Sequence, residues 1–150
     1  MVSLFSTLLL ACTAALNSTM VEVRKDFHQL HDAASLEQFT AAYSHIEEAA
    51  QAYCAVVEMR KANYVSNPYH KLKHFTLGKE QLEDYIAARP NCVEGRYCRY
   101  LAQIKCPRFL GYTANLEEDY NFVQSYSNNQ GVPEAYLVKM RKTLKALKEV

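Results

Sequence analysis

The sequence predicts an all-α protein of a single domain, built from about seven helices that pair as antiparallel hairpins. Three observations support this fold class. Apolar residues recur at spacings of three and four along most of the chain, no alternating run is long enough for a strand, and Gly and Pro number only four each in 150 residues. A chain of this length buries roughly two thirds of the surface that its unfolded form exposes, so it requires neither a metal nor a disulfide to fold.

The first three helices are each predicted from a residue pair with the spacing of a capping box. The pairs are Thr19 with Glu22, Ser35 with Gln38, and Ser44 with Glu47. An apolar face follows each pair: Met20, Val23, Phe27 and Leu30, then Leu36, Phe39, Tyr43 and Ile46, then Ala50, Tyr53, Val57 and Tyr64. These faces are expected to point into the core.

The later helices are bounded mainly by prolines. Asn67 and Pro68 start a fourth helix, because Asn caps well and Pro loses nothing in a first turn. Pro90 ends it. A fifth helix runs from about Val93 to Lys105. The inward residues of these two helices are Leu72, Phe75, Gly78, Leu82, Tyr85 and Ile86, and then Tyr97, Leu101 and Ile104.

Two more helices complete the chain. Asn115 with Glu118 has capping spacing and starts the sixth helix, and Pro133 starts the seventh after a polar turn. Their inward faces are Leu116, Tyr120, Val123 and Tyr126, and then Leu137, Met140, Leu144 and Leu147. The outer face of the last helix is basic, which is typical either of a docked terminal helix or of a helix that lies on an anionic membrane or partner.

Gly78, Leu82, Ile86 and Pro90, followed by a new helix, resemble the second helix of a tetratricopeptide repeat and its terminal proline. Residues 71–112 are also similar to a group of small exported bacterial helical proteins of unassigned activity, through Gly-Lys, Pro-Asn, Glu-x-Arg-Tyr-x-Arg and Pro-x-Phe-Leu-x-Tyr patterns. The resemblance implies a right-handed, tetratricopeptide-like array whose concave face is built by the first helix of each pair. It implies an architecture and no chemistry.

Residues 1–16 form an apolar run that is too short for a membrane span and fits a signal peptide or a lipoprotein leader. The stretch Leu9 to Cys12 resembles a lipobox, so Cys12 is a possible lipidation site. We therefore expect residues 17–150 to form one domain that is exported to the periplasm or secreted. The alternative is that residues 1–16 form a structural helix of the fold.

The charge and the reactive side chains exclude several classes of function. With 17 basic and 16 acidic residues, the chain lacks the basic excess of a nucleic-acid-binding protein. Cys54, Cys92, Cys98 and Cys106 are spaced too widely for a zinc site, and we expect them to be buried thiols, with one disulfide at Cys54 as the alternative. No nucleophile elbow or phosphate-binding loop occurs, so no catalytic residue, metal or cofactor is predicted.

The most suggestive segment for binding is "EGRYCRY", because Arg and Tyr are enriched in interface hot spots. Arg96, Tyr97, Arg99 and Tyr100 are therefore the predicted binding residues for a protein or peptide partner. The alternative is that the arginines form structural ion pairs while the tyrosines pack. The competing functional class is a small metal- or ligand-dependent envelope enzyme that uses His70, His74 and a cysteine, since the two histidines share a helix face.

Overall fold

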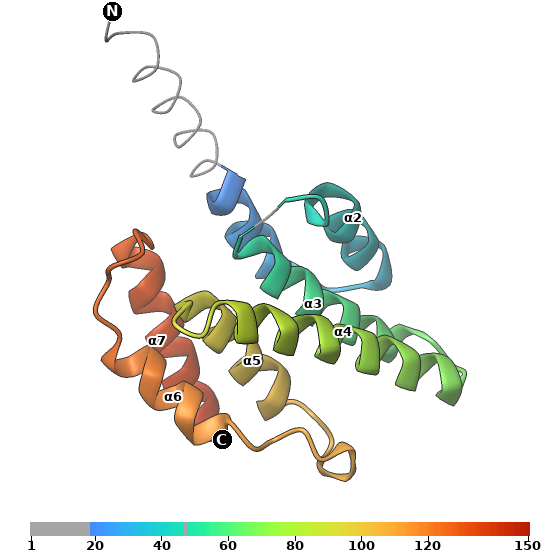
Figure 1. Ribbon diagram of the computed structural model, residues 1–150. Helices are drawn as coiled ribbons and strands as arrows, with labels where there is room; N and C mark the ends of the chain where they lie inside the picture. The colour runs from blue at the N-terminus through green and yellow to red at the C-terminus, as the bar shows by residue number, and fades with distance from the viewer. Residues whose placement is uncertain (1–18, 47) are drawn as a thin grey trace, which may run out of the picture.

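The computed structural model describes residues 19–46 and 48–150, and over these ranges the chain forms seven α-helices and no strand (Figure 1). This confirms the all-α class and the predicted number of helices. The first helix covers residues 19–27. The others are α2 (Ala33–Tyr43), α3 (Ala50–Lys61), α4 (Pro68–Ala88), α5 (Val93–Ile104), α6 (Leu116–Ser125) and α7 (Glu134–Lys148), with 3-10 turns η1 (Ala62–Tyr64) and η2 (Arg108–Leu110). The predicted leader, with Cys12, lies outside the described residues.

The start of α4 is built as the sequence predicts. The Asn67 side chain accepts a hydrogen bond at 2.8 Å from the backbone N–H two residues further on, and Pro68 occupies the first helical position. The predicted boundaries at the other prolines are confirmed too. The fourth helix ends before Pro90, α5 ends before Pro107, and α7 begins directly after Pro133.

The starts of α2 and α3 differ from the prediction. Asp32 caps α2, because its carboxylate accepts from the Ser35 N–H at 2.7 Å while the Ser35 hydroxyl accepts from the Asp32 N–H at 3.1 Å. Ser35 is therefore inside the helix, and the charged Asp32 is the stronger partner for the free N–H groups of the first turn. Ser44 ends α2 rather than starting α3, which begins at Ala50; Glu47 lies outside the described residues.

The start of α6 lies where predicted, but its capping bond is replaced by a contact with α5. Gln103 is 1% exposed, and its amide donates to the Asn115 side-chain oxygen at 3.1 Å while accepting from the Asn115 N–H at 3.0 Å. A buried amide needs such partners, so Gln103 takes the side chain that would otherwise cap the helix. This pair of hydrogen bonds holds the start of α6 against α5.

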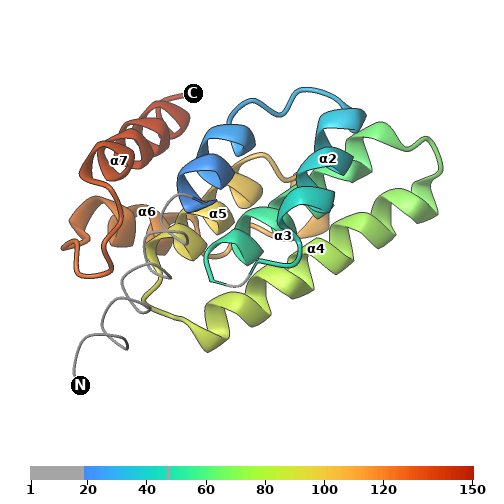
Figure 2. The same ribbon diagram turned by 90° about the horizontal axis from the view of Figure 1, so that it is seen from above.

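Helices α3 and α5 lie at the centre of the fold. α3 contacts α2, α4 and α5, whereas α5 contacts α3, α4, α6 and α7. α3 and α4 run antiparallel as a hairpin, and α4 lies along one side of the molecule (Figures 1 and 2). The helix at 19–27 covers α3, where the rings of Phe27 and Tyr53 lie 4.9 Å apart.

Gly78 determines how closely α4 approaches α3. A Cβ atom at this position would lie 2.5 Å from the Ala55 carbonyl oxygen and 2.7 Å from the Met59 backbone nitrogen. These atoms belong to the backbone of α3 and cannot move aside cheaply, so only glycine fits. The glycine that supports the tetratricopeptide resemblance is thus a helix-crossing residue.

Most of the predicted inward residues are buried or partly buried in one core. Two of them are exposed: Tyr64 at 46% and Leu72 at 54%. Tyr64 lies in η1, beyond the end of α3. Leu72 lies in the first half of α4, a helix of 21 residues that is longer than its partner α3 with 12 residues. This part of α4 lies beside the end of α3 and η1, which leave the Leu72 side chain at the surface.

Candidate functional site

The four predicted binding residues all lie on α5, but they face different neighbours. Tyr97, Arg99 and Tyr100 are buried, and Arg96 is half-buried. Arg96, Arg99 and Tyr100 contact α4 and α6, whereas Tyr97 lines a groove on the molecule. The structure therefore does not bring the four side chains together into one surface.

Arg99 is held by two carboxylates. Its guanidinium donates to both oxygens of Asp119, at 2.6 and 2.8 Å, and to Glu83 at 3.0 Å. Tyr112 donates to the other oxygen of Glu83 at 2.5 Å. Burial of the guanidinium opposes its charge, but Asp119 and Glu83 outweigh burial and raise the pKa of Arg99. The cluster ties α5 to α4, to α6 and to the loop after η2.

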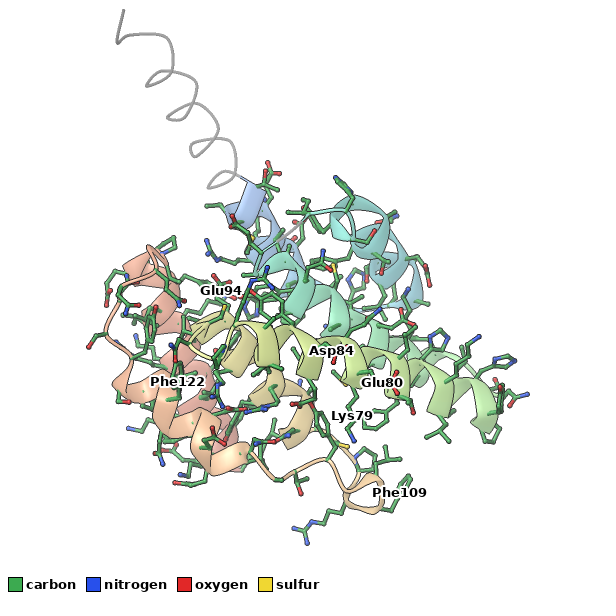
Figure 3. All side chains as sticks on the ribbon, in the orientation of Figure 1. Lys79, Glu80, Asp84, Glu94, Phe109 and Phe122 are labelled. Carbon is green, nitrogen blue, oxygen red and sulfur yellow. The ribbon has the colours of Figure 1, made fainter. Side chains whose placement is uncertain are left out.

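Arg96 and Tyr100 also contact α6. Arg96 donates to Glu118 at 2.6 Å and to Asp119 at 3.0 Å, and its guanidinium carbon lies 5.2 Å from the ring centre of Phe122, which is labelled in Figure 3. The rings of Tyr100 and Tyr120 lie 6.1 Å apart. Both arginines and Tyr100 are thus engaged within the fold, and their role in binding a partner stays a prediction.

An open, mainly apolar groove of about 990 Å³ lies between the first half of α4 and the second half of α5. The end of the helix at 19–27, α3, η1, the η2 loop and α7 complete its walls. α4 and α5 pack closely at their junction, where Gly95 lies against Tyr85, and the groove opens further along them, between Leu72 and Leu101. Its size is at the upper end of the range of ligand pockets.

The lip of the groove carries exposed apolar side chains. Phe109 of η2 is 86% exposed and Leu72 of α4 is 54% exposed. Phe109 lies at the outer edge of the molecule, on the loop below α4 (Figure 3). Phe75 supports the wall between them, with its ring 6.0 Å from that of Tyr112. Exposed apolar side chains gathered at a concave site are typical of an interaction surface.

Tyr97 lies behind the wall of this groove. The residue is fully buried at 0% exposure, and its hydroxyl makes no well-aligned hydrogen bond with any of the described residues. Burial raises the pKa of this hydroxyl, whereas a hydrogen-bonding contact with the Thr143 side chain, which also lines the groove, lowers it. The hydroxyl is closed off from solvent, so its polar neighbour is Thr143 and not a group that enters the groove.

The charged residues that line the groove are all basic. Arg60 of α3, Lys71 of α4 and Lys105, which follows α5, contribute to its walls, and no Asp or Glu does among the described residues. Arg60 donates to the Leu30 carbonyl oxygen at 2.9 Å. Lys71 and Lys105 are exposed and form no ion pair with a carboxylate of the described chain.

A second polar cluster is buried where the helix at 19–27, α3, α5 and α7 meet. The Glu94 carboxylate, labelled in Figure 3, accepts from Arg24 at 2.5 and 3.2 Å and from the Tyr53 hydroxyl at 2.6 Å. The chain of contacts continues to the Tyr136 hydroxyl, 2.8 Å from that of Tyr53, and to His28 Nε2, 3.3 Å from that of Tyr136. Every member has a partner, so the cluster holds four helices together.

His70 and His74, the predicted alternative site, are not joined by a third ligand. His74 Nδ1 lies 2.8 Å from a Glu58 oxygen, whose other oxygen pairs with Lys61 at 3.1 Å, and the ring of His70 lies against Tyr69. Across 19–46 and 48–150, no group of three His, Cys, Asp or Glu side chains is placed to hold a metal.

The four cysteines within the described ranges are free thiols. Cys98 is fully buried, and burial raises its pKa well above the ordinary value. Burial also raises the pKa of Cys54, to about 11. Cys98 is a buried thiol, as the sequence predicts, whereas Cys54, Cys92 and Cys106 are only partly buried.

The basic C-terminal helix is docked. α7 buries Tyr136, Leu137, Met140 and Leu144. Arg141 donates to the Val123 and Tyr126 carbonyl oxygens at 3.2 and 2.6 Å. None of the helices in the described ranges combines the length and the apolar character that crossing a membrane requires.

Sequence reasoning missed most of the groove. Leu72 was assigned to the core because it follows the helical spacing, although its side chain is exposed. A signal for Phe109 was present: a large apolar residue inside the loop between Pro107 and Gly111 belongs to no helical face that could bury it.

No protein-family model matches the chain, and comparisons with curated proteins and with solved structures find no match.

Proposed function

We propose that this protein is a non-enzymatic binding module that holds a peptide segment of a protein partner in the groove between α4 and α5. The observation that carries the proposal is the exposure of Phe109 and Leu72 beside a concave apolar site of about 990 Å³. Covering such side chains releases about 25 cal/mol for each Å² of apolar surface, so a partner with complementary apolar residues gains affinity there.

The groove is lined by groups suited to binding rather than to chemistry. Cys106 lines it, but burial raises the pKa of its thiol, so the nucleophilic thiolate is scarce. His28 also lines it, and its Nε2 atom lies against the Tyr136 hydroxyl, 3.3 Å away, rather than against a nucleophile. These features favour a binding role over the alternative of an enzyme.

The proposal includes a compartment. The apolar leader expected at residues 1–16 makes the periplasm or the exterior the place where the partner is met. Lipidation at Cys12 would add a membrane anchor without changing the groove, because the groove is built from residues 27–147.

The test is a selection from a random peptide library displayed on phage, with the immobilised protein as the bait. An enriched peptide is then synthesised with a fluorescent label, and its affinity is measured by anisotropy. Leu72→Gln is expected to weaken binding about fivefold or more, and Phe109→Ser about tenfold or more, since each removes apolar area from the contact.

Leu77→Gln is the matched control. Leu77 is an exposed leucine of the same helix, at 41%, but it does not line the groove. Gln has nearly the helix propensity of Leu, so neither variant disturbs α4. The proposal fails if no peptide is enriched, or if the enriched peptide binds the Leu72→Gln and Phe109→Ser variants as tightly as the wild type.

A further inference from the structure

We infer that the segment bound in the groove is acidic: a peptide with apolar residues whose carboxylates pair with the cations of the groove. This inference rests on the proposed function and specifies its partner. It concerns the charge of the partner, a property that the apolar lip does not determine.

The charges of the groove are one-sided. Arg60 lies in α3, Lys71 in α4 and Lys105 directly after α5, so positive charge borders the site on several sides. The whole chain carries a net charge of only +1, which makes three cations without a lining carboxylate a local excess. Complementary potentials select partners and accelerate their association, and the complement here is negative.

Two of the three groove cations, Lys71 and Lys105, differ from those that the fold uses, whereas Arg60 also holds the Leu30 carbonyl oxygen at 2.9 Å. Lys61, next to Arg60 in the sequence, forms ion pairs with Glu37 and Glu58 at 3.5 and 3.1 Å. Lys148 pairs with Glu117 at 2.9 Å. Lys71 and Lys105 have no such role, so their charges remain available to a ligand.

The experiment is the same library selection, analysed for charge. The peptides enriched on the wild-type protein are expected to carry more Asp and Glu, and fewer Lys and Arg, than the input library. For a labelled enriched peptide, replacing its acidic residues by Asn and Gln is expected to lower affinity, and raising the salt concentration is expected to weaken the acidic form more than the amide form.

Lys71→Gln and Lys105→Gln are each expected to lower the affinity for the acidic peptide about 1.5- to 5-fold, which is the range for a solvent-exposed ion pair. Lys73→Gln is the matched control, because Lys73 is exposed on the same helix as Lys71 but does not line the groove. An equal loss of affinity in Lys73→Gln would contradict the assignment of Lys71 and Lys105 as peptide contacts. The preference for acidic peptides would then follow from the net charge of the protein alone.

The outcomes separate this inference from the proposed function. Enrichment of peptides without an acidic bias, with binding still lost in Leu72→Gln, leaves the peptide groove standing and overturns the acidic partner. No enrichment at all overturns both. If sedimentation shows a dimer that Leu72→Gln converts to a monomer, the occupant is a second copy of the chain, and the acidic peptide is again wrong.

Discussion

Arg99 of α5 and Asp119 of α6 form a bidentate ion pair that is almost completely removed from solvent, with the two side chains 6% and 0% exposed. Glu83 of α4 contacts the same guanidinium at 3.0 Å, so three helices meet at one cation. Removing one partner of a buried pair leaves an uncompensated charge, whereas a pair at the surface contributes little.

Asp119→Asn is therefore expected to lower the free energy of unfolding by about 3–5 kcal/mol, because Arg99 stays buried without its main counter-charge. Urea denaturation followed by far-UV circular dichroism measures the loss. Glu117→Gln, on the same helix but exposed and paired with Lys148, is expected to leave stability nearly unchanged. Equal losses in the two variants would contradict the special role of the buried pair.

Gly78→Ala is expected to destabilise the protein by about 1–3 kcal/mol, although Ala favours helices over Gly by about 1 kcal/mol. The added Cβ would lie 2.5 Å from a carbonyl oxygen of α3 and would force the two helices apart. Gly95→Ala serves as a comparison, since its Cβ would meet only side-chain atoms of Tyr85 and Ile86, at 3.1 Å or more. Thermal unfolding of both variants provides the measurement. A larger decrease in Tm for Gly95→Ala than for Gly78→Ala would refute the prediction.

Tyr97→Phe and Tyr53→Phe remove the same atom from two fully buried side chains, and we expect opposite results. The Tyr53 hydroxyl donates to Glu94 at 2.6 Å, so its loss costs about 1–3 kcal/mol. The Tyr97 hydroxyl makes no well-aligned hydrogen bond in the described chain, so its removal leaves stability unchanged or slightly raised. A loss of stability equal to that of Tyr53→Phe would show that the hydroxyl is already paired.

His28 is expected to make stability depend on pH. Burial, aided by the charge of Lys139, lowers the pKa of His28 from 6.5 to about 4. Between these values the unfolded chain binds a proton that the folded chain does not, so the free energy of unfolding falls as the pH is lowered through this window. Urea titrations between these pH values are expected to show that the free energy of unfolding falls less steeply for His28→Gln than for the wild type. The variant keeps the titrating carboxylates and lacks only the His28 imidazole.

Lys139→Gln provides a second measurement for the same residue. Removing the neighbouring charge is expected to raise the pKa of His28 in the folded protein toward its ordinary value. The lower limit of the pH range in which stability depends on His28 then moves upward. If His28→Gln and the wild type lose stability in parallel, the buried histidine is not the source of the pH dependence.

Much of the fold could be predicted from local signals. Asn67 and Pro68 start α4, Pro133 precedes α7, and the spacing of three and four buries Val23, Leu82 and Leu144. These features depend on neighbours within one turn of helix, and the sequence contains all of them. The capping of α2 and α6 was misassigned because the competing partners, Asp32 and Gln103, act through contacts that residue spacing alone does not rank.

What the sequence by itself determined is the set of helices, their apolar faces and the near-neutral charge of the chain. Only the tertiary structure decided which of those faces remains uncovered. The groove lies between the first half of α4 and the second half of α5, with Leu72 at its lip. Arg96, Arg99 and Tyr100 instead contact α4 and α6. The physical reason is that helix formation is governed within a few residues, whereas burial and ion pairing depend on segments that lie far apart along the chain.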